Sequence, residues 1–182
     1  MSAMRPPPPA RLVKRLQDER QRGREYQPRF RPGQVGVAWL GALLSIALLS
    51  GLSAWSGVPF IAAPLGASAV LLFGYPASPL AQPRNIVLGN LVGASLAAIA
   101  NTWLGNGPLV VALAVGFTIL LGQQLRCLHP PAGGLAFLGV AFRSPPEFVL
   151  FPVLVGSLLM VVLALAFSRY VRGAQPYPYH WL

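Results

Sequence analysis

The chain carries six apolar segments that are separated by short polar or proline-containing stretches. The first, Val35 to Trp55, has 21 residues without a charge. At about 1.5 Å per helical residue, that length crosses a hydrocarbon core of about 30 Å. The other five segments run over residues 58–74, 85–104, 109–125, 130–142 and 148–167. The pattern predicts an all-α fold, a polytopic membrane helix bundle.

Two of these segments are too short or too broken to be ordinary membrane helices. Residues 58–74 contain Pro59, Pro64 and Gly66, and the 13 residues 130–142 contain a Pro-Pro and a Gly-Gly pair. A broken helix persists in lipid only where protein or water surrounds its backbone, because every N–H and C=O group must be satisfied there. We expect half-helices, re-entrant loops, or spans that an extended stretch completes.

The two short segments correspond to each other. An offset of 66 residues places Pro64 over Pro130 and Ser78-Pro79 over Ser144-Pro145. After a gap of three residues, "LVGASL" from Leu91 lies over "LVGSLL" from Leu154. A Ser-Pro pair suits the start of a helix, so each half reads as a long helix, a short broken segment and a second long helix. Two inverted three-segment repeats are therefore expected.

The charges divide the chain into a tail at residues 1–34, a membrane domain at 35–168 and a short tail at 169–182. Repeat one would cover 35–104 and repeat two 107–168. Nine Lys or Arg and three acidic residues precede Gly33, whereas only Arg84, Arg126, Arg143 and Glu147 are charged from Gly33 to Ser168. A water-facing domain is about one quarter charged, so the solvent of this stretch is lipid.

The basic N-terminal tail and the loop charges suggest an orientation. "RLVKRLQDERQRGRE" predicts one or two helical turns in a disordered or surface-lying tail that anionic headgroups attract. Nucleic acid is disfavoured as a partner, because no aromatic residues interleave the arginines. Six crossings leave both termini in the cytoplasm and only Arg143 outside, whereas four crossings would also put Arg84 and Arg126 outside. We expect six crossings in the inner (plasma) membrane of a bacterium.

Gly/Pro-interrupted segments at matching positions of two halves point to a transporter's binding site. A helix that begins at such a break aims backbone N–H groups at it, which suits an anion, and the spans contain no Asp or Glu for a cation. We expect an anion site near the membrane midplane. Its binding or pathway residues would be His129, Pro130, Pro131, Gly133, Gly134, Pro64, Gly66, Ala67, Ser68, Asn90 and Gln123. The alternatives are that these prolines and glycines only allow close packing and that His129 bonds a carbonyl.

Other residues have simpler expected roles. Arg84 and Arg126 either attract anions to the cytoplasmic side or anchor the helices there. Gly89 and Gly93 form a small face for helix packing, within the subunit, which we favour for this face, or across a dimer. If the protein forms an oligomer, we favour a homodimer. The aromatic end at 177–181 predicts an interfacial anchor. No metal site and no cofactor are expected.

With these motifs in place, the chain resembles the HPP family of integral membrane proteins. The resemblance rests on "LHPPAGGLAF" at 128–137 and "PLGASAVLLFGYPASPLAQPRNIVLGNLVGA" at 64–94, and it covers about 34–167. Plant members are associated with nitrite transport in plastids, so the resemblance implies transport of a small anion, with nitrite as the leading candidate. A membrane sensor or assembly subunit and an intramembrane hydrolase with a Ser68–His129 pair stay open. We expect a protein that is not an enzyme.

Overall fold

The computed structural model describes all residues except 1–9, 27–28, 58–62 and 182. The chain forms two units, Met1–Pro32 and Gly33–Leu182. The first contains α1 (Ala10–Tyr26), a helix of 17 residues in which Leu12 and Leu16 are exposed. The one or two turns predicted from the sequence were too few, because Arg, Lys, Gln, Glu and Leu are all good helix formers.

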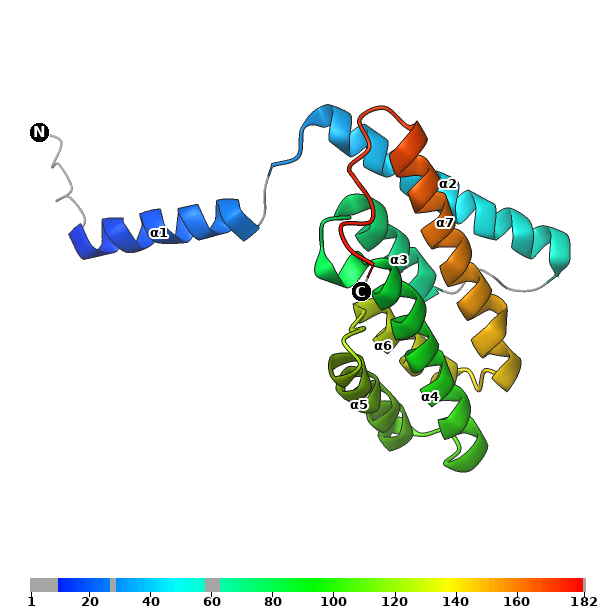
Figure 1. The fold of residues 1–182 in the computed structure, drawn as a ribbon. Coiled ribbons are helices and arrows are strands. Elements are labelled where there is room, and N and C mark those ends of the chain that lie inside the picture. Colours follow the sequence, from blue (N-terminus) through cyan, green and yellow to red (C-terminus); the bar gives the residue numbers. More distant parts are fainter. Residues whose placement is uncertain (1–9, 27–28, 58–62, 182) are drawn as a thin grey trace, which may run out of the picture. The chain divides into compact units, whose positions relative to one another are not determined.

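In its described residues, the second unit is a bundle of six α-helices (Figure 1). They are α2 (Pro32–Ser56), α3 (Ala63–Gly74), α4 (Asn90–Trp103), α5 (Pro108–Gln124), α6 (Pro130–Ala141) and α7 (Val155–Tyr170). Within the described residues, three helices are long and apolar enough to cross a membrane, namely 32–56, 85–103 and 146–170, the last of which has a kink at Phe151. The all-helical membrane fold predicted from the sequence is confirmed. The predicted second segment includes residues 58–62, which lie outside the described part of the chain, and its helix begins only at Ala63.

The order of elements repeats along this unit. After α2 and α3 come a 3₁₀ turn, η1 (Pro79–Ala81), a π segment, η2 (Asn85–Gly89), and α4. After α5 and α6 come a 3₁₀ turn, η3 (Pro146–Val149), a π segment, η4 (Leu150–Leu154), and α7. The short helices α3 and α6 have 12 residues each. The inverted repeat stays a prediction, which this order favours.

The Ser-Pro pairs lie near the predicted starts, but only the first forms the expected cap. Ser78 is the N-cap of η1, and its hydroxyl accepts a hydrogen bond of 3.2 Å from the backbone N–H of Leu80. In the second half Pro145 takes the cap position and the 3₁₀ turn begins at Pro146. The second turn therefore starts one residue later than the alignment predicted.

Small residues bring α4 and α6 into close contact. A Cβ atom added to Gly93 would collide with the carbonyl oxygen of Ala132, and one added to Gly139 would lie 2.6 Å from the Cβ of Ala97. The buried residues where these helices meet α5 include Ala97 and Ala136, both fully buried. The expected small face of α4 therefore packs within the subunit.

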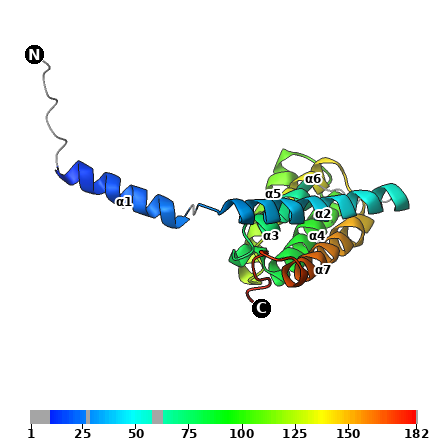
Figure 2. The ribbon, with the colours of Figure 1, turned by 90° about the horizontal axis from the view of Figure 1, so that it is seen from above.

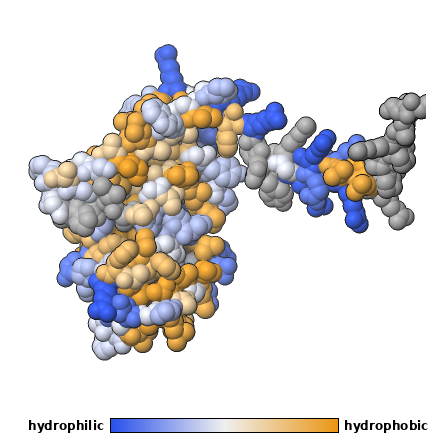
Figure 3. Space-filling view, turned by 180° about the vertical axis from the view of Figure 1, so that it is seen from behind, coloured by the Kyte–Doolittle hydropathy of each residue, from blue (hydrophilic) through white to orange (hydrophobic). Residues whose placement is uncertain are grey.

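Larger side chains fill the space between α2, α3 and α7. Leu49, Leu65, Leu72, Phe73 and Phe167 belong to this second core, and the rings of Phe73 and Phe167 meet edge to face at 5.6 Å between centroids. Figure 2 shows α2 and α7 running over α3 and α4 on this side of the bundle. Apolar residues also cover much of the outer face in Figure 3, as a lipid-facing surface requires.

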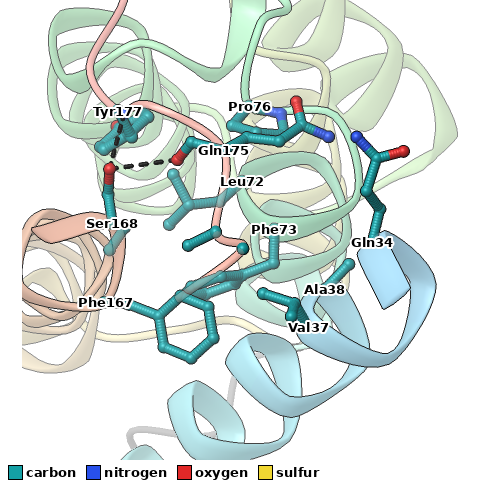
Figure 4. A pocket seen from close by; sticks show the side chains of 13 residues that line it. Gln34, Val37, Ala38, Leu72, Phe73, Pro76, Phe167, Ser168, Gln175 and Tyr177 are labelled. Carbon is teal, nitrogen blue, oxygen red and sulfur yellow. Dashed lines mark hydrogen bonds between the residues drawn. The ribbon is translucent and has the colours of Figure 1, made fainter. Parts of the chain in front are cut away.

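Hydrogen bonds define the two ends of the bundle. At one end, which we name the Arg84 end, a guanidinium nitrogen of Arg84 donates to the carbonyl of Leu125 at 2.8 Å. At the other, the Arg143 end, Arg143 donates to the Asn106 side chain at 2.7 Å. Gln34, in the N-terminal turn of α2, and Gln175, in the C-terminal segment, line one small pocket (Figure 4). The N-terminal and C-terminal parts of this unit therefore lie on the same side of it.

The C-terminal segment folds back onto the Arg84 end. The buried Tyr177 donates its hydroxyl proton to the carbonyl of Ala81 at 3.0 Å, and its backbone N–H donates to Ser168 at 2.9 Å (Figure 4). Burial raises the pKa of Tyr177 well above its ordinary value. The prediction of an interfacial anchor was therefore wrong for Tyr177, which packs against the protein. Tyr179 and Trp181 are exposed.

Candidate functional site

His129 lies where the two short helices meet. It is the N-cap of α6, with φ −138° and ψ 111°, as expected for a residue that precedes proline. The side chain is only 2% exposed, although it belongs to a lipid-facing bundle. A buried polar ring must find hydrogen-bond partners, and both ring nitrogens of His129 have one.

The partners of His129 come from the first half of the chain. Nδ1 lies 2.9 Å from the carbonyl oxygen of Leu80, and Nε2 lies 2.8 Å from the hydroxyl of Ser68 on α3. A carbonyl only accepts, so Nδ1 carries the hydrogen. In the neutral ring, Nε2 then accepts a hydrogen bond from the Ser68 hydroxyl. One buried imidazole thus connects α6, α3 and η1.

The same atoms accommodate a second proton state. The Ser68 hydroxyl is also 3.2 Å from the carbonyl of Pro64, one turn earlier in α3. If Nε2 of His129 gains a proton, it donates to Ser68, whose hydroxyl then donates to Pro64. No hydrogen bond is lost in this exchange, because donors and acceptors swap roles in sequence. The pair can therefore hold His129 in either the neutral or the protonated state with every ring nitrogen hydrogen-bonded.

The start of α6 does not offer the backbone amides expected from the sequence. Pro130 and Pro131 have no N–H group, and the N–H of Ala132 donates to the carbonyl of His129 at 2.9 Å. The helix therefore begins without its usual unpaired donors. The expectation that backbone N–H groups of this segment hold an anion was wrong, and the polar groups at this break are His129 and Ser68.

The level of His129 along the bundle follows from its contact with Gly89. A Cβ atom added to Gly89 would lie 2.7 Å from the Cβ of His129, so these residues are level with each other. Gly89 is four residues after Asn85, the start of the continuous helix 85–103, which corresponds to about 6 Å along its axis. His129 therefore lies closer to the Arg84 end than to the middle of this helix.

This position shows how the fifth apolar segment is completed. The stretch before α6 packs against η2, where the Asn85 side chain donates to the carbonyl of Leu128 at 2.8 Å. At the other end, the Asn101 side chain of α4 donates to the carbonyls of Gly139 and Ser144. α6 and the extended residues before it thus accompany α4 for nearly its full length. Of the three possibilities, the structure favours a span completed by an extended stretch.

Not every predicted site residue lies near His129. Pro64 contacts Gly134, since a Cβ atom there would be 3.2 Å from the Pro64 ring, and Gly133 has room for a methyl group. Pro131 is buried and Gly66 is half-buried. In contrast, Pro130, Ala67 and Gln123 are exposed. The last three face outward, so the structure does not bring them into the contact between α3 and α6.

Asn90 belongs to a separate buried polar contact. Its amide donates to the hydroxyl of Ser157 on α7 at 3.0 Å, and both residues are fully buried. The Asn90 oxygen and the Ser45 hydroxyl on α2 have no hydrogen-bond partner among the described residues. Ser157 and Ser45 were not singled out in the sequence. Ser157 lies in the "LVGSLL" block that supports the repeat. A polar residue in an apolar block of the membrane domain could therefore have indicated this buried contact.

Arg84 and Arg126 lie together at the Arg84 end, as their loops suggested. Arg84 is half-buried and caps the carbonyl of Leu125, while its Nε atom is buried without a partner among the described residues. Arg126 is exposed and adopts a left-handed conformation, with φ 52°. Arg84 therefore has a structural role at the end of α5, and its attraction of anions stays a prediction.

These features define a polytopic helical membrane protein with a buried Ser–His contact between two short helices. The HPP transmembrane region family matches residues 27–178, and the chain belongs to that family. Two transmembrane proteins of Dictyostelium discoideum are each 34% identical to it over 81% of the chain. The chain spans about half of the length of these relatives, 56% and 51%. No solved structure matches it.

Proposed function

We propose that this membrane protein transports a small inorganic anion, with nitrite as the leading substrate, and that His129 and Ser68 lie on the pathway. The observation that carries the proposal is a buried, fully hydrogen-bonded imidazole between two short helices. The only charged residues from Gly33 to Ser168 are three arginines and Glu147. This distribution favours an anion over a cation, since cation carriers use acids within their spans. The nitrite assignment rests on the resemblance to plant members of the family.

The described state is closed at this point, because Ser68 is fully buried and His129 nearly so. Passage of an anion therefore requires α3 and α6 to separate, which breaks the 2.8 Å contact between Ser68 and His129. A protonated His129 that loses Ser68 as a partner presents Nε2–H to an anion. We propose that one proton accompanies each anion, so that the pair moves without net charge.

The test is nitrite and formate uptake by liposomes that contain the purified protein, with and without an inward proton gradient. Uptake is expected to exceed that of empty vesicles and to rise with the gradient. His129→Gln and Ser68→Ala should each lower it at least tenfold. His180→Ala is the matched control, because His180 is the chain's other histidine and lies exposed in the C-terminal tail. The absence of uptake of every small anion would refute transport.

A second candidate, an intramembrane hydrolase, is favoured by one observation. The Ser68 hydroxyl lies 2.8 Å from Nε2 of His129, within the range of roughly 2.6–3.2 Å that a nucleophile and its base require. The Leu80 carbonyl orients the ring from the other side. The third group is a carbonyl and not a carboxylate, and Ser68 is fully buried. We propose that the protein is not an enzyme. A fluorophosphonate probe that labels the protein at Ser68, and not the Ser68→Ala variant, would contradict this.

The orientation of the protein in the membrane and the lipid contacts of its basic tail belong to the same proposal. We propose that both termini lie in the cytoplasm and that the basic tail, including α1, binds anionic lipid headgroups. Arg84, Arg126 and Arg169 would then face the cytoplasm and Arg143 the opposite side. Protease protection of tags at either terminus in sealed vesicles tests this orientation. A homodimer and a bacterial inner membrane stay predictions.

A further inference from the structure

A second polar site lies at the end of the bundle that is opposite to His129. A pocket of about 400 Å³ opens between the α4–α5 loop and the loop that follows α6. Its lining includes Asn101, Thr102, Asn106, Arg143 and Ser144. The volume corresponds to roughly a dozen water molecules, which is ample for a small hydrated ion.

The charge of this pocket is positive. Arg143 donates to the Asn106 side-chain oxygen at 2.7 Å, which holds its guanidinium against the α4–α5 loop. That contact uses one of the five N–H donors of an arginine. In the described part of the chain no salt bridge joins Arg143 to Glu147, so the guanidinium keeps donors for a ligand. Since Asn106 accepts through its oxygen, its amide NH₂ group is left to donate.

Two carbonyls at the end of α6 that would repel an anion are already engaged. A helix C-terminus carries partial negative charge on its last carbonyls. At the end of α6, the Asn101 side chain donates to the carbonyls of Gly139 and Ser144, and the backbone N–H of Ser144 also donates to Gly139. The Asn101 oxygen is buried without a partner among the described residues. It suits a water molecule that bridges to the ligand.

Arg143 also occupies a backbone conformation that does not favour arginine. It follows α6 with φ 52°, where glycine is preferred because a side chain crowds the backbone. The N–H of Arg143 donates to Val140 and that of Ser144 to Gly139, which is the hydrogen-bond pattern of a glycine-type helix end. Arg126 ends α5 in the same conformation, so what distinguishes the Arg143 side chain is its contact with Asn106 at the pocket.

We propose that this pocket binds a small inorganic oxyanion through Arg143, Asn106 and Ser144, as the entry site opposite His129. The inference rests on the proposed anion transport, and it adds a second binding site to the pathway. α6 carries His129 at its first end and Arg143 just after its last, so a movement of this helix changes both sites together. The ligand class is a planar or tetrahedral oxyanion such as nitrite, nitrate or phosphate.

The test is protection of arginine side chains from phenylglyoxal, followed by peptide mass spectrometry of the detergent-solubilised full chain. Sodium nitrite, nitrate and phosphate are the probes, and sodium gluconate at equal ionic strength is the reference. Arg172, which is exposed in the C-terminal tail, is the internal control. We expect nitrite to slow modification of Arg143 at least fivefold and that of Arg172 by less than twofold. Asn106→Leu should abolish the protection of Arg143 without changing the rate at Arg172.

The outcomes separate this inference from transport itself. Nitrite uptake by liposomes without protection of Arg143 would overturn the entry site and leave the transport proposal standing. Protection without uptake would support the site and refute transport. Equal slowing at Arg143 and Arg172, or protection by gluconate as well, would show only a general salt effect and overturn the inference. Equal protection in wild type and Asn106→Leu would refute the role of Asn106 in the site.

Discussion

The close contact between α4 and α6 provides the sharpest test of the structure. Gly93 lies on α4 against the backbone of Ala132, and an alanine there would place its methyl group on the Ala132 carbonyl, 2.9 Å from the carbonyl carbon. Backbone atoms cannot yield as a flexible side chain does, so the two helices must separate. Overpacking of this kind destabilises by about 1–3 kcal/mol, beyond the ~1 kcal/mol that alanine gains over glycine in a helix.

Gly116 on α5 is the matched control for Gly93→Ala. It is also a helical glycine, but no atom lies within 4 Å of an added Cβ, so Gly116→Ala should gain about 0.5–1 kcal/mol. The two variants should then differ by about 1.5–4 kcal/mol in the free energy of unfolding. At roughly 2–4 °C per kcal/mol, their Tm values should differ by about 3–16 °C. Equal Tm values in thermal unfolding monitored by tryptophan fluorescence in detergent would refute the α4–α6 contact.

Three other predictions follow from buried or strained groups. Tyr177→Phe removes the hydrogen bond to Ala81 and should lower stability by about 1 kcal/mol, measured by thermal unfolding. Because burial raises the pKa of Tyr177 above its ordinary value of 10.0, its contribution is complete below pH 10 and is lost above it, so wild type and Tyr177→Phe should converge in Tm at high pH. Ser157→Ala leaves the buried Asn90 amide unpaired and should cost about 1–2 kcal/mol, whereas Asn90→Leu combined with Ser157→Ala should recover part of the loss in a double-mutant cycle. Arg143→Gly and Arg126→Gly both relieve a φ of 52°, so each should raise the free energy of unfolding by about 0.5–1 kcal/mol. Only Arg143→Gly should remove oxyanion binding at the Arg143 end. A loss of stability in both variants would contradict the assigned conformations.

The positions of the helices could be predicted from the sequence because apolar runs and their breakers are local signals. The third segment was expected at 85–104 and is a continuous helix at 85–103, which ends where Gly105 and Pro108 follow. The fifth was expected at 130–142 and is α6, Pro130–Ala141. Pro130 marks this start because a proline fits the first turn of a helix and not its interior.

The site could be predicted only in part, because its contacts join distant residues. His129 and Ser68 were both candidates, but their direct hydrogen bond depends on how α3 packs against α6. The lack of amide donors at α6 was readable in the sequence, since Pro130 and Pro131 cannot donate. The pocket at Arg143 was not, because Asn106 is 37 residues away and comes close only in the folded bundle.

Gln82 is a buried polar residue that the sequence prediction missed. It was not among the candidate residues, yet it is fully buried and donates to the carbonyls of Pro76 and Ser78. Its side-chain oxygen accepts hydrogen bonds from the backbone N–H groups of Tyr179 and His180. An amide near a proline-rich turn reads as a surface residue until the C-terminal segment that covers it is known.

Three successive residues of the turn at the Arg84 end bind both the candidate site and the C-terminal segment. The Leu80 carbonyl accepts from His129, the Ala81 carbonyl from Tyr177, and the Gln82 side chain from the Tyr179 backbone. A displacement of His129 that moves this turn is therefore transmitted to the end of the chain. Trp181, which is 58% exposed two residues beyond Tyr179, becomes an optical reporter of the buried histidine. A fluorophore attached there would follow the opening of the α3–α6 contact from outside the bundle.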